Sequence, residues 1–373
     1  MQVKERSEIV MAKYDIFTVA AIQNEIICVN ERSDIQKNLK RLLELIDCAP
    51  QTQVAAREHY AGSWAPIKLI STPEFVIQGH EGAWPYKHYI DNVLIEIPGP
   101  ETEQIAQKCK DYNIYFAGCA LERDEWIKEG YFWNTHFIIG PKGDIIHKYR
   151  KMTVAIHYEL AISPHDIKDK YAAAMGGDKL STWFPIADTE IGKIGTITCM
   201  DGHFPETARA LGIQGAEIIL HPLLTVPNMS KPADIWQCMN RMRAWENVCY
   251  VVGAAWGEIH SRRQKTFAPG QSMIVDYNGI VVALADYPGE AIITATVNLE
   301  ELRRRRMDPS RNFPTQLRTD IYRQIYDKEI YAPNMFASHS PEQRSERDSL
   351  GGIKQFIKEG IYHLPEKKPD WYK

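Results

Sequence analysis

Short apolar segments alternate with amphipathic helical patterns along this chain, and the same series occurs twice. In the first half, segments rich in β-branched residues predict strands at 16–23, 67–71 and 114–122, and helical spacing of apolar residues predicts helices at 33–48 and 101–112. The second half repeats the series, with strands predicted at 193–199, 216–222 and 249–256 and helices at 205–214 and 235–247. Each half also has a hairpin pattern with a Gly-containing turn, at 137–146 and 273–282. The repeat predicts an α/β fold, a four-layer α-β-β-α sandwich with internal pseudo-two-fold symmetry.

The pattern also suggests where the domain ends. A length of 373 residues is compatible with one or two domains, and the repeat favours a single unit over residues 14–300. Residues 301–373 are polar and aromatic and cannot bury a core of their own, so we expect this extension to dock on the domain or on a neighbouring subunit. Its aromatic residues predict a homo-oligomer, a dimer or higher, in which they are buried against a symmetry mate: Tyr322, Tyr326, Tyr331 and Phe336. The basic run 303–306 is interpreted as a solvated helical face or a subunit contact.

Charge and cysteine content exclude several classes of function. The chain has 44 basic and 48 acidic residues, a net charge of -4, which gives no overall attraction to nucleic acid or to anionic lipid. The charged N-terminus and the lack of a long uncharged apolar stretch predict neither export nor a membrane span. Seven cysteines without a C-x-x-C pair argue against a disulfide framework and a thiolate metal site. We therefore expect a cytoplasmic protein that binds neither nucleic acid nor a membrane.

The most informative local motif is C-M-D-G-H-F-P-E, which begins at Cys199 where a predicted strand ends. An Asp-Gly turn leads from there into a helix opened by Pro205, so the thiol is expected on a sharp turn near a helix N-terminus. Backbone N–H groups in such a place stabilise a thiolate and form an oxyanion pocket. By itself, a cysteine that closes a buried strand is more often inert packing.

Two further charged residues follow predicted strands. Glu74 comes after the strand 67–71, at the carboxyl end where α/β sheets place their ligand-facing groups, and it is a candidate base. Lys151 ends the run H-K-Y-R-K and, if desolvated, would stabilise an oxyanion or an ionised thiol. Taken singly, a helix-capping or surface carboxylate and a solvated cluster of cations are the more common explanations of these two motifs.

Glu74, Lys151 and Cys199 occur in this order at three strand ends, and the arrangement resembles the nitrilase (carbon-nitrogen hydrolase) superfamily. The matching motifs are P-E at 73–74, Y-R-K at 149–151 and C-M-D-G at 199–202. Gln23, the pair 134–135 and the stretch 243–247 match further family features, so the resemblance spans roughly residues 14–300. Glu159 lies where amidase-type members carry a structural or catalytic glutamate.

The resemblance implies a covalent mechanism. Glu74 is expected to take the thiol proton, Cys199 to attack the carbonyl carbon, and Lys151 with the Met200 backbone N–H to hold the oxyanion. Glu159 would orient Lys151 or the substrate. The resulting thioester would then be hydrolysed, and the resemblance implies that the reaction acts on a small molecule and needs neither metal nor cofactor.

The sequence after Cys199 favours amides over nitriles. Typical nitrilases have Trp-Glu after the nucleophile, whereas Met-Asp-Gly here is closer to the His-Asp-Gly of formamidases and aliphatic amidases. The run 203–206 echoes the carbamoylases, but the Arg pair of that branch is missing. The prediction is an amidase or carbamoylase, with a nitrile-converting enzyme and a non-catalytic binding subunit as alternatives. The substrate pocket is predicted from the loops at the strand ends: Trp84, Tyr86, His157, His203, Leu223 and Thr225.

Overall fold

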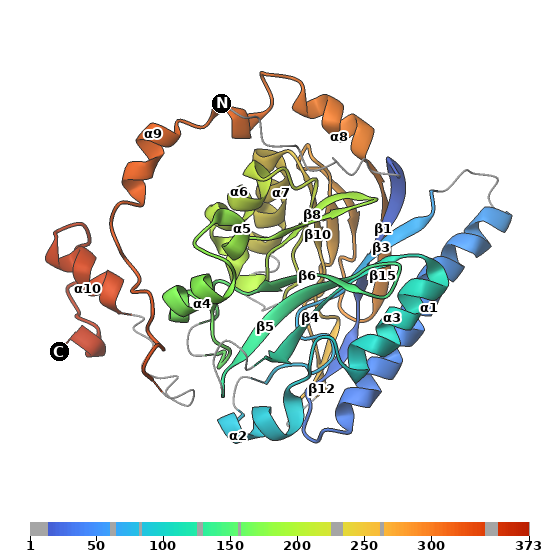
Figure 1. Ribbon diagram of the computed structural model, residues 1–373, viewed down its shortest axis with the longest axis horizontal. Helices are drawn as coiled ribbons and strands as arrows, with labels where there is room; N and C mark the ends of the chain where they lie inside the picture. Colours follow the sequence, from blue (N-terminus) through green and yellow to red (C-terminus); the bar gives the residue numbers. More distant parts are fainter. Residues whose placement is uncertain are drawn as a thin grey trace.

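Two six-stranded sheets form the centre of the protein. The computed structural model describes residues 14–59, 65–81, 84–124, 130–155, 158–224, 234–261, 265–339 and 350–372. The first sheet has the strand order β15-β1-β3-β4-β5-β6, and the second has the order β14-β13-β10-β9-β8-β7. Figure 1 shows the strands in the middle of the molecule with helices on either side.

In the first sheet, three parallel strands are followed by an antiparallel hairpin. The parallel strands β1, β3 and β4 pair in sequence order, β5 and β6 extend the sheet antiparallel to β4, and β15 pairs antiparallel with β1 at the other edge. Their bounds are Ile16–Gln23 (β1), Ile67–Ser71 (β3), Tyr115–Arg123 (β4), Phe132–Ile139 (β5), Ile145–Arg150 (β6) and Ala291–Asn298 (β15).

The second sheet repeats this arrangement. Parallel strands β8, β9 and β10 are followed by the antiparallel hairpin β13–β14, and β7 pairs antiparallel with β8 at the other edge. The bounds are Ile186–Thr189 (β7), Gly192–Thr196 (β8), Ile218–Leu220 (β9), Tyr250–Gly253 (β10), Met273–Val275 (β13) and Val281–Leu284 (β14). Strand directions and order correspond one to one between the sheets, as the repeat in the sequence predicts.

Helices cover the outer face of each sheet. Helices α1 (Asp34–His59) and α3 (Pro100–Tyr112) share an apolar core with the first sheet, and α6 (Pro205–Ile213) and α7 (Ile235–Asn247) share one with the second. A third core lies between the sheets and includes fully buried residues of both: Phe17, Leu69, Ile138, Ile194, Leu220 and Val252. The layers are therefore α-β-β-α, which confirms the predicted fold class. Helix α1 continues beyond the predicted end at 48, through Pro50.

Smaller elements complete the domain. Strands β2 (Glu25–Ile27), β11 (Glu258–His260) and β12 (Lys265–Phe267) form a three-stranded sheet, and short helices lie in the loops: α2 (Tyr86–His88), α4 (Lys168–Ala174) and α5 (Leu180–Trp183). No helix among the described residues is long and apolar enough to span a membrane.

The chain after β15 contains α8 (Leu299–Arg306), α9 (Thr319–Tyr322) and α10 (Gly351–Lys358). Leu299 and Leu302 of α8 are fully buried in the core between the sheets. Figure 1 shows α9 and α10 at the periphery of the molecule. One expectation for this segment is wrong: Phe336 is buried in a cluster with Tyr131 and Trp133 of its own domain, so it needs no symmetry mate.

The basic run in α8 also differs from its interpretation as a solvated face. Arg303 binds both carboxylate oxygens of Glu217 and also pairs with Asp15. Arg306 donates to the backbone carbonyls of residues 215, 216 and 248. Two of the four arginines therefore fasten α8 to the second sheet and its helices.

Candidate active site

The candidate residues lie where strands of both sheets end. Glu74 follows β3, Lys151 follows β6 and Cys199 follows β8. Strands β3 and β6 run in the same direction, so their carboxyl ends lie at one edge of the first sheet. All three residues thus follow strand ends, as the sequence predicts, and their catalytic roles stay a prediction.

Lys151 lies between two carboxylates. Its Nζ is 2.9 Å from Glu74 Oε1, and it is 2.9 and 2.8 Å from the two carboxylate oxygens of Glu159. These three residues are each 3% exposed or less. Glu74 also accepts a hydrogen bond from the backbone N–H of Leu224, and Glu159 accepts one from that of Ala155. Because every buried charge has a partner of opposite sign, the cluster is held without an isolated charge.

The charges in the cluster set the protonation states. Burial alone would lower the pKa of Lys151, but Cys199 when it is ionised, and the carboxylates of Glu159 and Glu74, raise it well above its usual range. Burial opposes ionisation of Glu159 too, and the charge and hydrogen bonds of Lys151 nevertheless hold its pKa below the ordinary value. Lys151 is therefore an ammonium and Glu159 a carboxylate at neutral pH.

The thiol of Cys199 is protonated in the resting site. Burial raises its pKa well above the ordinary value, and the charge of Glu74 and a hydrogen bond to that carboxylate raise it further, against the lowering effect of Lys151. The expectation of a stabilised thiolate is therefore wrong for the resting state, because burial and the carboxylate of Glu74 together disfavour the charged form. A thiol hydrogen-bonded to a carboxylate has a base in place to receive its proton.

Cys199 occupies a strained turn. It begins a 3₁₀ helix, Cys199–His203, with a φ of 48°, in the left-handed region that residues with a side chain rarely adopt. Its N–H donates to the carbonyl of Pro222, and its carbonyl interacts with the His221 ring at 3.1 Å. Helix α6 then begins with Pro205 in its first turn, as predicted. The turn is thus fixed on both sides of the sulfur-bearing residue.

Asp201 and Arg243 fix this turn further. Asp201 accepts hydrogen bonds from the hydroxyl of Tyr149 at 2.7 Å and from the backbone N–H groups of Thr153 and Thr198 at 2.7 and 3.0 Å. Burial raises the pKa of Asp201 to about 6. The Arg243 guanidinium donates twice to the carbonyl of Gly202. Asp201 thereby connects the turn of Cys199 to the loop that follows Lys151.

The residues predicted to line the substrate pocket fall into three groups. Trp84 and Leu223 are buried: Trp84 packs against the rings of His80, His88 and Tyr89, and Leu223 belongs to the core beneath α6 and α7. Met200 and Tyr86 are half-buried, and His203 is exposed. His157 and Thr225 lie outside the described residues.

Sequence reasoning assigned no role to two residues that touch the cluster. The side-chain nitrogen of Asn134 lies 2.9 Å from Glu74 Oε1 and 2.8 Å from Glu159 Oε1. The thiol of Cys119 donates to Asn134 Oδ1 at 3.0 Å. Asn134 was noted as a family feature, and its position on the strand before Lys151 was the available signal; nothing in the sequence distinguishes Cys119 from packing.

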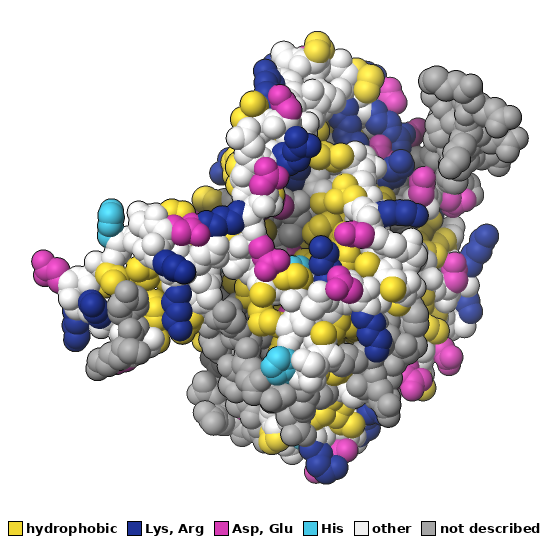
Figure 2. All heavy atoms as spheres, turned by 60° about the vertical axis from the view of Figure 1, so that its left-hand side comes forward, with side chains coloured by type: hydrophobic (Ala, Val, Ile, Leu, Met, Phe, Trp, Pro, Cys, Tyr) yellow, Lys and Arg dark blue, Asp and Glu magenta, His cyan; other side chains and the backbone are white. Residues whose placement is uncertain are grey.

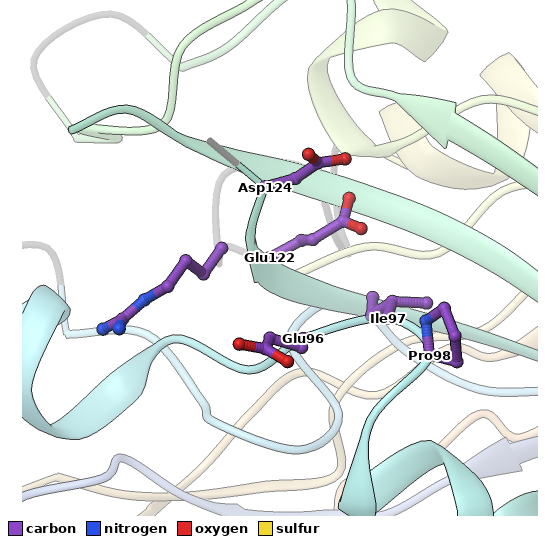
Figure 3. A pocket seen from close by; sticks show the side chains of 6 residues that line it. Glu96, Ile97, Pro98, Glu122 and Asp124 are labelled. Atoms are coloured by element: carbon purple, nitrogen blue, oxygen red, sulfur yellow. The ribbon is translucent and has the colours of Figure 1, made fainter. Parts of the chain in front are cut away.

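A pocket of about 380 Å³ lies elsewhere, where β4 ends beside the loop that precedes α3. Figure 3 shows the carboxylates of Glu122 and Asp124 on one side of it, and Glu96, Ile97 and Pro98 on the other. Glu122 already pairs with Lys148 and Arg150, and Asp124 pairs with Arg150. The pocket contains none of the candidate residues, and its buried carboxylates have partners, so it is not the site of the chemistry.

One further charged cluster lies on the three-stranded sheet. Glu25, Glu258 and His260 place their ligand atoms within 4.8 Å of one another, the one such group of His, Cys, Asp and Glu among the described residues. Lys265 Nζ lies 2.7 Å from Glu258 Oε2 and 3.8 Å from Glu25 Oε2. An ammonium thus lies beside both carboxylates where a metal ion would have to bind.

Comparison with known proteins identifies a single family. The model of the carbon-nitrogen hydrolase family matches residues 18–307. Formamidases of Bacillus cereus and Bacillus anthracis are each 29% identical over 239 residues, which make up 63% of this chain and 61% of theirs. The chain therefore matches about three fifths of the length of these relatives.

Solved structures share the fold at low sequence identity. A branch 10 member of the nitrilase superfamily from Saccharomyces cerevisiae has a TM-score of 0.60 and 24% identity, over 79% of this chain and 94% of that one. A carbon-nitrogen hydrolase from Helicobacter pylori has a TM-score of 0.62 and 19% identity, over 85% of this chain and 100% of that one. An amidase from Nesterenkonia sp. has a TM-score of 0.60 and 15% identity, over 86% of this chain and 99% of that one. Another structure of that amidase carries the acetamide moiety of fluoroacetamide covalently on its active-site cysteine.

Proposed function

Because the chain belongs to the carbon-nitrogen hydrolase family, we propose that it hydrolyses the C–N bond of a small amide or N-carbamoyl compound and releases ammonia. The observation that carries the proposal is the Lys151 ammonium between two buried carboxylates, one of which, that of Glu74, acts electrostatically on the Cys199 thiol. The formamidase relatives and the structurally similar amidase support an amide over a nitrile.

The first half of the proposed reaction forms a thioester. Glu74 takes the proton of Cys199, and the thiolate attacks the carbonyl carbon of the substrate. The negative charge moves to the carbonyl oxygen, where the Lys151 ammonium and the Met200 backbone N–H stabilise it. When the intermediate collapses, the C–N bond breaks and Glu74 gives its proton to the leaving nitrogen. Ammonia departs and the acyl group remains on the sulfur.

The second half returns the enzyme to its resting state. Glu74 takes a proton from a water molecule, whose oxygen attacks the thioester carbon at the position that ammonia has left. The C–S bond then breaks, the acid is released, and the thiolate regains its proton from Glu74. Glu159 remains ionised and keeps the Lys151 ammonium directed at the reacting oxygen. For Trp84, Tyr86, His157, His203, Leu223 and Thr225, contact with the substrate stays a prediction.

Assembly and location are part of the proposal. We propose that residues 301–373 contribute to a homo-oligomer, because apolar side chains there are exposed in the single chain: Met307, Ile321, Tyr322, Ile325, Tyr326 and Ile330. More exposed apolar residues lie in and next to α6 and α7: Phe204, Ile213, Ile235, Met242 and Trp245. Figure 2 shows hydrophobic side chains at the surface between charged ones. The seven cysteines are free thiols, which suits a cytoplasmic location.

The decisive experiment measures ammonia release from three substrate classes: aliphatic amides such as formamide, N-carbamoyl amino acids, and nitriles. We expect turnover of at least one amide or N-carbamoyl compound, and none with Cys199→Ala, because that change removes the nucleophile and little core volume. Cys238→Ala, which removes an exposed thiol, is the matched control and should be fully active. EDTA should leave turnover unchanged, since none of these steps uses a metal.

The other outcomes have distinct meanings. Turnover of nitriles alone would establish the nitrile-converting alternative. A folded chain that is inactive on all three classes would indicate a binding subunit. Activity that survives in Cys199→Ala would refute the thioester mechanism.

A further inference from the structure

Asn134 binds both carboxylates of the candidate site at once. It lies on β5 and its side chain is 1% exposed. Its Nδ2 is within 2.9 Å of an oxygen of Glu74 and an oxygen of Glu159, so each of its two amide hydrogens meets a different carboxylate. These are the same two oxygens, both Oε1, that Lys151 Nζ contacts. A neutral side chain thus duplicates the contacts of the ammonium.

The charge balance of the cluster explains why a second donor is needed. Two carboxylates share one ammonium, so the three side chains together carry one net negative charge in a buried site. When like charges approach in a low dielectric, one of the groups usually keeps a proton. Hydrogen bonds to the charged form counteract this tendency, and the Asn134 amide supplies two without adding a charge. The two glutamates can then remain carboxylates at close range.

The direction of the amide is itself fixed. The Cys119 thiol, fully buried on β4, donates to Asn134 Oδ1 and leaves Nδ2 facing the glutamates. The backbone carbonyl of Asn134 accepts a hydrogen bond from the N–H of Lys151 at 2.9 Å. One residue therefore contacts three members of the cluster, two through its side chain and one through its backbone.

We propose that Asn134 is a positioning residue that keeps Glu74 and Glu159 both ionised beside Lys151, with Cys119 fixing the direction of its amide. This inference deepens the proposed function and rests on it. Among the described residues, the other titratable groups that act on the cluster are the Cys199 and Cys119 thiols, His80, which acts electrostatically on Glu159, and Asp201, which interacts electrostatically with Lys151.

The test compares Asn134→Ala and Asn134→Ser with the wild-type chain. Without both amide hydrogens, one carboxylate should hold a proton to higher pH, so the acid limb of the kcat/KM profile should move up by about one pH unit. We expect kcat on formamide, or on whichever amide the wild type turns over, to fall roughly tenfold or more, with little change in KM. In the infrared spectrum, a protonated-carboxyl band should appear near neutral pH in the variants and vanish on alkalinisation.

Asn38→Ala is the matched control. Asn38 is an equally buried asparagine that donates to two backbone carbonyls, of Ile27 and Ile77, away from the cluster. Its removal should lower stability and leave both the pH profile and the infrared spectrum unchanged. If folded Asn134→Ala and Asn134→Ser behave like Asn38→Ala in both measurements, the positioning role is refuted. The infrared readout needs no substrate, and activity in Cys199→Ala refutes the proposed function separately.

The role of Cys119 has its own pair of variants. Cys119→Ser keeps a donor to Asn134 Oδ1 and should retain the wild-type pH profile, whereas Cys119→Ala should move the acid limb in the same direction as Asn134→Ala, to a smaller extent. Cys109→Ala removes an equally buried thiol in α3 and should leave the acid limb of the pH profile unchanged. If Cys119→Ala and Cys119→Ser give the same profile, the thiol does not orient the amide.

Discussion

Asp201 links two loops of the candidate site through a single carboxylate. Its three donors come from Tyr149, Thr153 and Thr198, which flank Lys151 on one side and Cys199 on the other. An asparagine at this position would replace one carboxylate oxygen, a hydrogen-bond acceptor, with an NH2 group. That NH2 group would face one of the three donors and could not accept its hydrogen bond. We expect Asp201→Asn to cost about 1–3 kcal/mol of unfolding free energy and to lower kcat roughly tenfold or more, because the Cys199 turn then shifts relative to Lys151.

Steady-state kinetics and urea unfolding measure the two effects of Asp201→Asn. Asp188→Asn, an exposed position on β7, is the control and should change neither quantity. A variant with unchanged kcat would show that the distance between the two loops does not depend on this carboxylate.

Residue types and order were enough to predict the charged core of the site. Glu74, Lys151 and Cys199 each follow a predicted strand and belong to a recognisable motif. Only a few types of side chain can act as base, nucleophile or oxyanion partner, so such residues can be found in a sequence. The pocket wall was less predictable, because an aromatic or aliphatic residue in a loop packs or contacts ligand with the same sequence signature; Trp84 and Leu223 turn out to be buried. Asn134 gains its importance only from carboxylates of two other segments, which one sequence cannot bring together.

Arg306 joins elements that are distant in the sequence. Its guanidinium binds the backbone carbonyls of Gly215 and Ala216, just after α6, and of Val248, just after α7. A guanidinium at the end of a helix satisfies carbonyls that have no partner within the helix. Helix α8 thereby holds the C-terminal ends of both helices that cover the second sheet.

We expect Arg306→Ala to lower the unfolding free energy by about 1–3 kcal/mol, because buried carbonyls then lack donors. Arg306→Lys should restore only part of the loss, since an ammonium cannot reproduce the planar set of donors. Arg304→Ala is the control: that side chain is 66% exposed, and its loss should change stability by less than about 0.5 kcal/mol. Urea unfolding of the three variants gives the comparison, and equal stability of Arg306→Ala and Arg304→Ala would exclude the linking role.

The strands and helices with a clear periodic spacing of apolar residues could be predicted from the sequence. The strands and helices of both halves follow the expected order, because each buries one face and its apolar spacing shows it. Strands β2, β11 and β12 are three residues long, too short for a period of two to be recognised. For Arg303 and Arg306 of α8 the interpretation as a solvated face was wrong, because sequence shows the charge of a side chain and not the carbonyls or carboxylates beside it.

For the whole molecule, three buried histidines predict sensitivity to acid. Burial lowers the pKa of His136 to about 3 and that of His147 and His221 to about 4. In the unfolded chain a histidine binds a proton below about pH 6.5. Between these values the unfolded state binds more protons, so the stability these groups contribute is complete above about pH 6.5 and is lost as the pH falls toward 4. Asp201 has the opposite effect, because its raised pKa stabilises the folded state at low pH. It therefore offsets part of the stability that the histidines lose.

Chemical unfolding at a series of pH values measures this effect. We expect His147→Gln to show a shallower decline of stability between about pH 6.5 and 4 than the wild type, because one proton-binding group of the unfolded chain is gone. His363→Gln, in the exposed tail, should have the wild-type slope. Identical slopes for all three proteins would show that buried histidines do not control acid stability.

The exposed apolar side chains of the tail, residues 301–373, predict that the chain associates with further copies of itself. Phe336 anchors the tail to its own domain, while Ile321, Ile325 and Tyr326 remain 56%, 62% and 58% exposed. Apolar side chains gathered on one segment lower the free energy when a second copy covers them. We therefore expect the full-length chain to sediment as a dimer or larger, and the chain truncated after Ile330 to associate more weakly, because it lacks α10 and the anchor that fixes the segment.

Point variants test the exposed apolar surface of the tail separately from the Phe336 anchor. Ile321→Asp and Ile325→Asp place charges on the exposed segment and should shift the sedimenting species toward monomer at equal protein concentration, while the folded domain stays intact. Ile280→Asp is the control, because Ile280 lies beside β14 and is exposed to the same 56% as Ile321. Its sedimentation should match the wild type. A full-length chain that is monomeric at micromolar concentration would contradict the assembly proposal. If the oligomer persists in both tail variants, the interface lies instead on the exposed residues in and next to α6 and α7.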